Sequence, residues 1–322
     1  MIQAGIIGGA GYTAGELIRL LITHPEVEIQ FVQSKSQAGK KISQLHTDLL
    51  GEIDLHFVPY PDYIDLDVLF LCLPHGEARQ FIAQENLPER LKVIDLSHDF
   101  RLKAEGNNFV YGLPELNYSQ IQENSHIANP GCFATAIQLA LLPLAKARLL
   151  DQEIHVHAIT GSTGAGQALS QTSHFSWRNN NVSVYKAFTH QHLGEIRQSL
   201  QQLQPHFQSA INFIPMRGNF SRGIMATAYT SVDLDESQAY RLYRDFYAGH
   251  PFVFITHENP DLKQVVNTNK ALLHLSKYEG NLLIISMIDN LLKGASGQAV
   301  QNMNLMFEFP ENCGLQLKAV YF

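Results

Sequence analysis

The chain has 322 residues, of which 45% are hydrophobic and 16% charged, and its formal net charge is −7. This composition supplies enough apolar side chains for a folded core, and the length suits two domains better than one. The 23 Lys and Arg residues form no basic run, which argues against a nucleic-acid partner. The three cysteines are few and widely spaced, so we expect no disulfide framework and a reducing, cytoplasmic environment. We expect neither a secretion signal nor a membrane span, because no window approaches ~18 unbroken apolar residues.

Short apolar strands alternate with helical segments in the first 130 residues. We expect strands at residues 2–7, 27–33, 67–73 and 92–96, with an amphipathic helix at 14–23. Continuous apolar strands separated by helices are typical of a parallel sheet covered on both faces. Right-handed crossovers then give an α/β, doubly wound, Rossmann-type domain.

The pattern changes to alternating strands after about residue 130. Strands are expected at residues 153–158, 224–232, 271–277 and 282–288, the last two joined as a hairpin, and helices at 134–149, 193–203, 235–248 and 293–307. This pattern predicts an α+β domain with a mostly antiparallel sheet. The final helix follows the hairpin and can return to the first domain. We therefore expect one domain formed by residues 1–130 and 290–322 and a second formed by residues 131–289.

A glycine-rich turn joins the first strand to the first helix. It satisfies the dinucleotide fingerprint, in which glycines admit a pyrophosphate and the helix N-terminus attracts its charge. We expect the cofactor to contact Gly8, Gly9, Ala10, Gly11, Tyr12, Thr13 and Ala14.

The end of the second strand distinguishes NAD from NADP. An NAD site has an acidic residue there, which accepts hydrogen bonds from the ribose hydroxyls. This chain has Ser34, Lys35 and Ser36 instead, and a cation with hydroxyl groups suits a 2′-phosphate. The sequence therefore favours NADP(H).

Cys132 follows Asn129, Pro130 and Gly131 and begins a helix-like stretch. Unpaired N–H groups and the helix dipole stabilise a thiolate in the first helical turn, so Cys132 is the candidate nucleophile. Asn129 can donate a hydrogen bond to the oxyanion that forms on an attacked carbonyl.

A partner base for this thiol is expected among the 15 histidines. His190 and His192 are the candidates, because they end a long polar loop and precede a helix. Their spacing also suits two metal ligands, but no third and fourth ligand with zinc-type spacing accompanies them. We expect no metal.

Three arginines and one loop are candidates for holding an anionic substrate. Arg101, Arg217 and Arg222 lie in or beside segments with polar and glycine residues, where a guanidinium can bind a carboxylate or phosphate. The polar loop after residue 160 offers small hydroxyl and main-chain donors that can form an anion-binding nest, at Thr163, Gly164, Ala165 and Gly166.

Several motifs together resemble the N-acetyl-gamma-glutamyl-phosphate reductase family, relatives of aspartate-semialdehyde dehydrogenase. The resemblance spans essentially the whole chain, and the segments that carry it are residues 8–17, 38–40, 70–76, 95–101, 111–117, 129–132, 190–196 and 289–304. This chain departs from the usual family pattern at Lys35, Thr163 and Gln191, and in the longer segment 216–223.

The resemblance implies an NADPH-dependent reduction of an acyl phosphate to a semialdehyde in arginine biosynthesis, through a thioester on Cys132. His192 would be the acid/base with His190 adjacent, Asn129 would line the oxyanion region, and Arg101 with the 163–166 turn would hold phosphate. The cofactor set would also include Pro74, Gly164 and Asn290, the last at the start of a helix. The resemblance also implies a homodimer or homotetramer.

Related activities stay open on the sequence alone. The amine protection can be acetyl or succinyl, and an aminoadipyl-phosphate or aspartyl-phosphate reductase would use the same chemistry. A rival of another class is a redox sensor that binds NADP and oxidises Cys132 without turnover.

Overall fold

The computed structural model describes residues 1–322, which form two compact units. The first comprises residues 1–130 with 295–316, and the second comprises residues 131–294 with 317–322. Residues 290–294 and 317–322, expected in the first domain, thus group with the second unit. No helix has both the length and the apolar character needed to cross a membrane.

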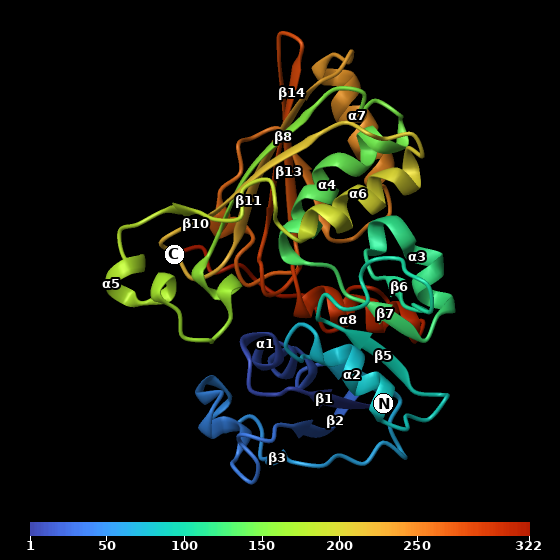
Figure 1. Ribbon diagram of the computed structural model, residues 1–322, viewed down its shortest axis with the longest axis vertical. Coiled ribbons are helices and arrows are strands. Elements are labelled where there is room, and N and C mark those ends of the chain that lie inside the picture. Colours follow the sequence, from blue (N-terminus) through green and yellow to red (C-terminus); the bar gives the residue numbers. More distant parts are fainter. The chain divides into compact units, whose positions relative to one another are not determined.

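A seven-stranded sheet forms the centre of the first unit (Figure 1). Its strand order is β3-β2-β1-β4-β5-β7-β6, and every neighbouring pair is parallel. The order reverses between β1 and β4, which is the topological switch point where doubly wound folds bind their ligands. The predicted Rossmann-type fold is confirmed, with strands β1 (Ile2–Ile7), β2 (Val27–Gln33), β3 (Phe57–Val58), β4 (Val68–Leu71), β5 (Lys92–Asp95), β6 (Val110–Tyr111) and β7 (His126–Ala128).

Helices cover both faces of this sheet. On one side, α2 (Glu77–Gln84) contributes to an apolar cluster that includes Phe31, Leu69, Leu71 and Val93. On the other side, α8 (Ser296–Met306) packs against α1 (Tyr12–Leu21) and α3 (Pro114–Glu123). Every residue of α8 is buried, including its Gln and Asn side chains, so their polar groups need partners inside the unit.

The second unit is built on a seven-stranded mixed sheet of order β12-β13-β14-β11-β8-β10-β9. Most pairs are antiparallel, as predicted, whereas β10 with β8 and β12 with β13 are parallel. The strands are β8 (Ile154–Thr160), β9 (Ser183–Val184), β10 (Ile211–Arg217), β11 (Ile224–Ser231), β12 (Val253–Thr256), β13 (Ala271–Tyr278) and β14 (Asn281–Ile288).

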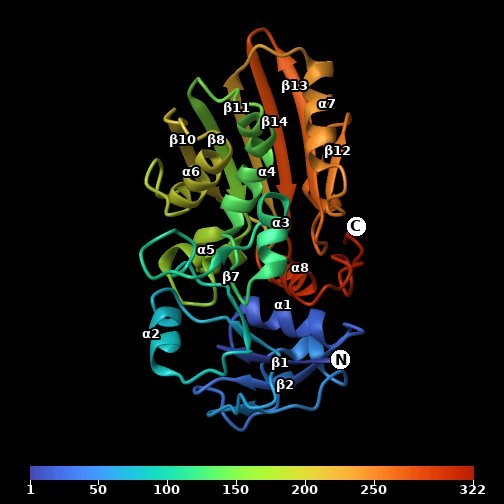
Figure 2. The same ribbon diagram turned by 90° about the vertical axis from the view of Figure 1, so that its right-hand side faces the viewer.

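The helices of the second unit lie along one face of its sheet (Figures 1 and 2). They are α4 (Cys132–Lys146), α6 (His192–Leu203) and α7 (Glu236–Tyr247), while the four-residue α5 (Phe175–Arg178) lies in the loop after β8. Helix α4 is the central one, and its residues from Phe133 to Ala145 are all buried. A residue at the start of this helix therefore stands on a rigid support.

The last helix begins three residues later than expected, at Ser296 instead of residue 293. Both side-chain oxygens of Asp289 accept hydrogen bonds, and Oδ1 takes those from the N–H groups of Leu291 and Leu292. Asp289 also accepts a main-chain hydrogen bond from Gly294. These bonds hold residues 289–294 in a separate turn, so Asn290 lies six residues before the helix.

Candidate functional site

The glycine-rich turn of the first unit has the shape of a nucleotide cradle. Gly8 has φ +82° and a Cβ there would come 2.6 Å from the main-chain oxygen of Cys72, while a Cβ on Gly9 would overlap Val32. A Cβ on Gly11 would meet nothing within 4 Å, so open space lies beside the N-cap of α1. The first turn of α1 contains no acidic residue. These features fit the pyrophosphate of a dinucleotide.

The neighbouring strand ends lie at the same edge of the sheet. Gln33 at the end of β2 directs its Oε1 to the N–H of Gly8, 3.4 Å away, and occupies the position where an NAD site carries an acid. Ser34 is buried, whereas Lys35 and Ser36 are exposed beyond it. The turn after β4 presents Pro74 to solvent. The residues therefore fit a cofactor that carries a 2′-phosphate, which Lys35 and Ser36 would hold.

In the second unit, Cys132 is the first residue of α4, and Gly131 is its N-cap. No disulfide involves Cys132, and its side chain is half-buried. The first turn of α4 contains no acidic residue that would offset the positive end of the helix dipole. This is the position at which the helix dipole favours a negative charge, as the nucleophile hypothesis requires.

Two side chains from the start of α6 contact the residue before the nucleophile. The carboxylate of Glu195 accepts a 2.9 Å hydrogen bond from the N–H of Gly131. The ring of His192 lies so close that a Cβ on Gly131 would overlap it, and His192 Nε2 is 3.8 Å from Glu195 Oε1. Both side chains are buried. Glu195 therefore contacts both the imidazole of His192 and Gly131, the N-cap of helix α4.

The second histidine of the pair is neutral. His190 Nδ1 accepts a 3.2 Å hydrogen bond from the N–H of His192, so the remaining proton of the neutral ring is on Nε2. Burial, with the nearby charges of Lys186 and Arg217, lowers the pKa of His190 to about 4. Its ring packs edge-on against Phe133 and Phe213. His190 is thus a hydrogen-bond donor at neutral pH and not a proton-transfer group.

A tyrosine and an arginine lie beside this pair. The guanidinium of Arg217 lies 4.7 Å above the Tyr185 ring and hydrogen-bonds the Tyr185 side chain, while its buried Nε has no hydrogen-bond partner. Burial and the charge of Cys132 raise the pKa of Tyr185 to about 12, although Arg217 acts in the opposite direction. The main-chain oxygen of Arg217 accepts from Arg178. Arg217 therefore places a positive charge beside Tyr185 and His190.

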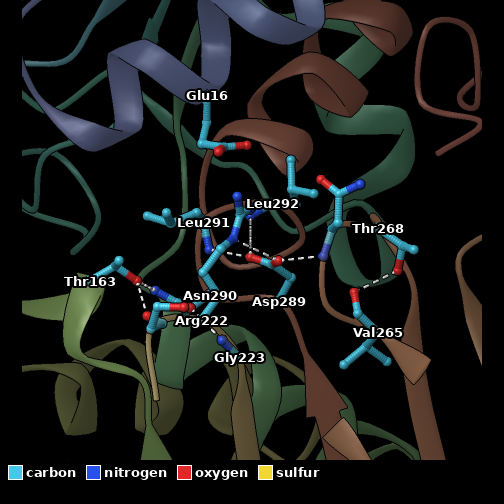
Figure 3. A network of polar contacts seen from close by, with 12 residues as sticks. Glu16, Thr163, Arg222, Gly223, Val265, Thr268, Asp289, Asn290, Leu291 and Leu292 are labelled. Carbon is cyan, nitrogen blue, oxygen red and sulfur yellow. Dashed lines mark hydrogen bonds and ion pairs between the residues drawn. The ribbon is translucent and has the colours of Figure 1, made fainter. Parts of the chain in front are cut away.

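The loop after β8 uses its polar groups mainly to hold itself. Thr163 donates from its hydroxyl to Ser221 O and accepts from Asn290 Nδ2, as Figure 3 shows. Asn290 Oδ1 accepts from the N–H of Gly223. The N–H groups of Gly164 and Gly166 bond within the turn, which includes Ala165. We therefore assign these donors of residues 163–166 to the loop's own structure instead of to phosphate.

The two remaining arginines are engaged by the protein. Arg222 forms a two-point ion pair with the fully buried Asp289, at 3.1 Å for both contacts (Figure 3). Arg101 is buried in the first unit and donates to Asn129 O and to Leu96 O. Both guanidinium groups therefore have internal partners, and the substrate contacts expected from the sequence stay predictions.

Asn129, in the first unit, also has internal partners. Its Nδ2 donates to Ala295 O at 2.9 Å and its Oδ1 accepts from Asn302 at 3.0 Å. Its side chain is therefore part of a buried hydrogen-bond chain, which is different from the oxyanion role expected.

The sequence reasoning assigned no function to Glu195 or Tyr185. Glu195 could have been found because it follows His192 by three positions, which places both side chains on one face of a helix start. Tyr185 lies in an irregular segment, where Lys186 and Phe188 both have positive φ, and no sequence pattern signals that geometry.

Comparisons with known proteins cover the whole chain. Residues 3–124 match a family model described as the semialdehyde dehydrogenase NAD binding domain, and residues 132–290 match the semialdehyde dehydrogenase dimerisation domain. The chain is 59% identical over 322 residues to the N-acetyl-gamma-glutamyl-phosphate reductase of Parabacteroides distasonis, and both chains are fully covered. The protein of that name from Flavobacterium johnsoniae is 56% identical, with 99% of each chain covered.

Solved structures show the same fold at low identity. Aspartate semialdehyde dehydrogenase II from Vibrio cholerae superposes with a TM-score of 0.75 at 16% identity, covering 96% of this chain and 98% of the other. The enzyme from Candida albicans, solved with NADP, has a TM-score of 0.69 at 15% identity, with 95% and 98% covered. The full-length relatives carry the more specific assignment, and the chain belongs to the N-acetyl-gamma-glutamyl-phosphate reductase family of the semialdehyde dehydrogenases.

Proposed function

We propose that this chain reduces N-acetyl-γ-glutamyl phosphate to N-acetylglutamate semialdehyde with NADPH, releasing phosphate, as a step of arginine biosynthesis in the cytoplasm. The observation that carries the proposal is the arrangement at the start of α4. Cys132 begins the helix, and His192 and Glu195 are packed on Gly131 directly before it. Relatives with that printed name share more than half of all residues over the full length.

In this reaction Cys132 acts as the nucleophile and His192 transfers the protons. The Cys132 thiolate attacks the γ-acyl carbon, the bond from that carbon to the phosphate oxygen breaks, and a thioester forms on sulfur. NADP(H), when bound, supplies the hydride that reduces the thioester carbon. His192 gives a proton to the oxygen that becomes charged and takes one back as the C–S bond breaks and the aldehyde leaves.

The anionic substrate would be bound by the hydrogen-bond donors that lie near His192, one of them positively charged and one neutral. Arg217 offers a guanidinium whose Nε has no partner within the protein. His190 remains neutral at pH 7 and offers its Nε2–H. The substrate phosphate or α-carboxylate would therefore gain a charge-assisted hydrogen bond from Arg217 and a neutral one from His190.

The function is tested with the purified full chain in the reverse direction. Phosphate-dependent reduction of NADP⁺ is followed at the nicotinamide absorbance with N-acetylglutamate semialdehyde, and separately with the N-succinyl analogue and aspartate semialdehyde. We expect the N-acylated glutamate substrate to react fastest. Preference for aspartate semialdehyde would overturn the substrate assignment, and NADP⁺ binding without turnover of any semialdehyde would favour a redox sensor.

The covalent route has its own test. Cys132→Ala is expected to lower kcat by about 10³-fold or more, because no thioester forms. Cys132→Ser is the matched variant. It keeps the size of the side chain but replaces the thiol with a hydroxyl, which is a weaker nucleophile. Retention of more than a few per cent of activity by Cys132→Ala would exclude the thioester.

Cofactor preference is tested at the end of β2. Lys35→Glu places an acid beside the ribose and should lower the preference for NADP over NAD by about tenfold or more, measured as the ratio of kcat/KM values. Lys40→Glu, which changes an exposed lysine of the following turn, is the control for net charge. An unchanged ratio in Lys35→Glu would remove Lys35 from the cofactor site.

A homo-oligomer is part of the same proposal. The second unit matches a dimerisation domain, and the helices pack on only one face of its sheet. A dimer, or a tetramer built from two dimers, would cover the other face.

A further inference from the structure

The chain passes between its two units at three places, after Pro130, after Gly294 and after Gln316. The first two passages are the ones near Cys132. Cys132 lies two residues beyond the first of these passages. Any shift of residues 129–131 therefore moves the start of α4. Contacts within each unit fix the chain on either side of the passages after Pro130 and after Gly294.

In the first unit, a chain of buried amides joins the two segments. Asn129 Nδ2 donates to Ala295 O at 2.9 Å, and Asn302 Nδ2 donates to Asn129 Oδ1 at 3.0 Å and to Gly112 O at 2.9 Å. Asn302 is fully buried and Asn129 is 1% exposed. Both N–H bonds of the Asn302 amide are therefore used, and water cannot replace them readily.

In the second unit, the same two segments are in contact through a glycine. A Cβ on Gly294 would come 2.8 Å from Cys132 Cβ and 2.7 Å from Asn290 O. Residue 294 must therefore be glycine for Cys132 to occupy its place. The segments before Cys132 and after Gly294 are thus held together by hydrogen bonds on one side and by close packing on the other.

Two further bonds connect this assembly to its surroundings in the first unit. Ser296 Oγ donates to Thr13 O at 2.8 Å, in the first turn of α1 beyond the glycine-rich turn. Arg101 Nε donates to Asn129 O at 2.8 Å. The two segments that the amides join are therefore also bonded to the first turn of α1 and to Arg101.

We propose that Asn302 and Asn129 are positioning residues that set the place of Cys132 for its reaction. They act on the proposed acyl-phosphate reduction without touching the substrate. Asn302 fixes the Asn129 side chain, and Asn129 fixes the main chain at Ala295, so the two passages keep a constant spacing. Loss of the amide donors leaves a folded enzyme whose thiol is misplaced.

The test compares two asparagines of the same helix. Asn302→Asp keeps the shape but replaces both N–H donors with oxygen, which then faces Gly112 O and Asn129 Oδ1. Asn304→Asp is the matched control, because Asn304 is also fully buried and donates to two main-chain oxygens, those of Glu311 and Cys313. Asn304 Oδ1 also bonds His24 Nε2 at 3.0 Å, so Asn304→Asp keeps an acceptor contact while it loses the two donors. The control therefore reports what the loss of two amide donors inside α8 does away from Asn129.

Two measurements are made on each full-length variant. The first is the rate at which iodoacetamide alkylates Cys132 over a range of pH, followed by mass spectrometry of its peptide. The second is kcat and KM for the acyl phosphate. We expect Asn302→Asp to slow alkylation and to lower kcat by about tenfold or more, with KM changed less than threefold, as for a misplaced reacting group. Asn129→Ser combined with Asn302→Asp should be no worse than Asn302→Asp alone.

The outcomes separate this inference from the proposed function. Alkylation and kcat at the wild-type level in Asn302→Asp, or equal losses in Asn304→Asp, would overturn the positioning role. If the wild type proves to be no reductase, the alkylation rates still decide whether Asn302 sets the thiol. If Asn302→Asp does not fold, Gly112→Ala replaces it, because the new Cβ would come 2.5 Å from Ile127 Cγ2 and 2.6 Å from Asn302 Nδ2, so both side chains must move. The same slowing is expected there, and an unchanged rate overturns the proposal.

Discussion

At the scale of single residues, one carboxylate organises the proposed catalytic centre. Glu195 accepts the N–H of Gly131 with Oε2 and places Oε1 3.8 Å from His192 Nε2. A buried carboxylate needs such partners, because an isolated charge inside a protein is strongly destabilising. The contacts of Glu195 with Gly131 and His192 therefore provide the partners that a buried carboxylate needs, and they orient the His192 ring.

His190 gives a prediction about pH. Burial lowers its pKa from 6.5 to about 4, so the folded protein keeps the ring neutral between these values while the unfolded chain takes up a proton. Stability is therefore lost as the pH falls from 6.5 to 4, by up to about 3 kcal/mol from this group. His190→Gln should unfold with a smaller dependence on pH in this window, measured by thermal unfolding. His206→Gln, at an exposed position, is the control, and equal pH dependence in all three proteins would contradict the assignment.

At the scale of elements, the strongly patterned segments were predictable from the sequence. Strands β1 and β2 have the expected ends, because each is a continuous apolar run ending at a turn. Strand β10 was not predicted, although it is central to how Arg217 is placed. Its sequence contains Pro215, which removes a ladder donor, and it pairs in parallel with β8, a partner more than 50 residues away that local pattern does not reveal.

The candidate functional site was also predictable only in those parts that depend on local sequence. The fingerprint turn and the cysteine at a helix start depend on local sequence, and the structure has both. The partners of the arginines were not predictable, because Asp289 and Arg222 are joined by folding and are 67 residues apart. A guanidinium beside a glycine turn has the same local sequence whether it binds a substrate or a buried acid.

The contact between the turn at 289–294 and helix α4 gives a prediction at this scale. Gly294→Ala adds a methyl group 2.8 Å from Cys132 Cβ and 2.7 Å from the main chain at Asn290, so the start of α4 must move. We expect kcat to fall by about tenfold or more, with a loss of about 1–3 kcal/mol in stability from overpacking. Gly280→Ala is the control, since its nearest neighbour would be 3.4 Å away. Full activity of Gly294→Ala would show that the turn tolerates displacement.

At the scale of the whole molecule, the free face of the second unit's sheet is the surface on which we expect assembly, because this unit matches a dimerisation domain. Alternate residues of β11, at Ala226 and Ala228, are buried on the face that carries α4. Register pairs Ile159 with Met225 and Tyr229 with Leu283 across neighbouring strands, and it places Ile285 between Thr227 and His274. The face opposite to α4 thus presents apolar side chains that are partly buried or exposed. They are Ile159, Met225, Tyr229, Leu283 and Ile285. Contiguous exposed apolar patches on soluble proteins are often interaction sites, so we expect a protein partner on this face.

A second copy of this chain is the partner we expect on that face, because this unit matches a dimerisation domain. Ile285→Glu places a charge on the same face of the sheet as these apolar side chains, and a buried charge in an interface weakens association strongly. We expect its dimer dissociation constant, measured by sedimentation equilibrium, to rise by about 100-fold or more. Asn281→Glu, at the exposed end of the same strand, is the matched control and should assemble normally. A wild-type protein that is monomeric at micromolar concentration, or an Ile285→Glu variant that assembles as well as the control, would exclude this face as the dimer interface.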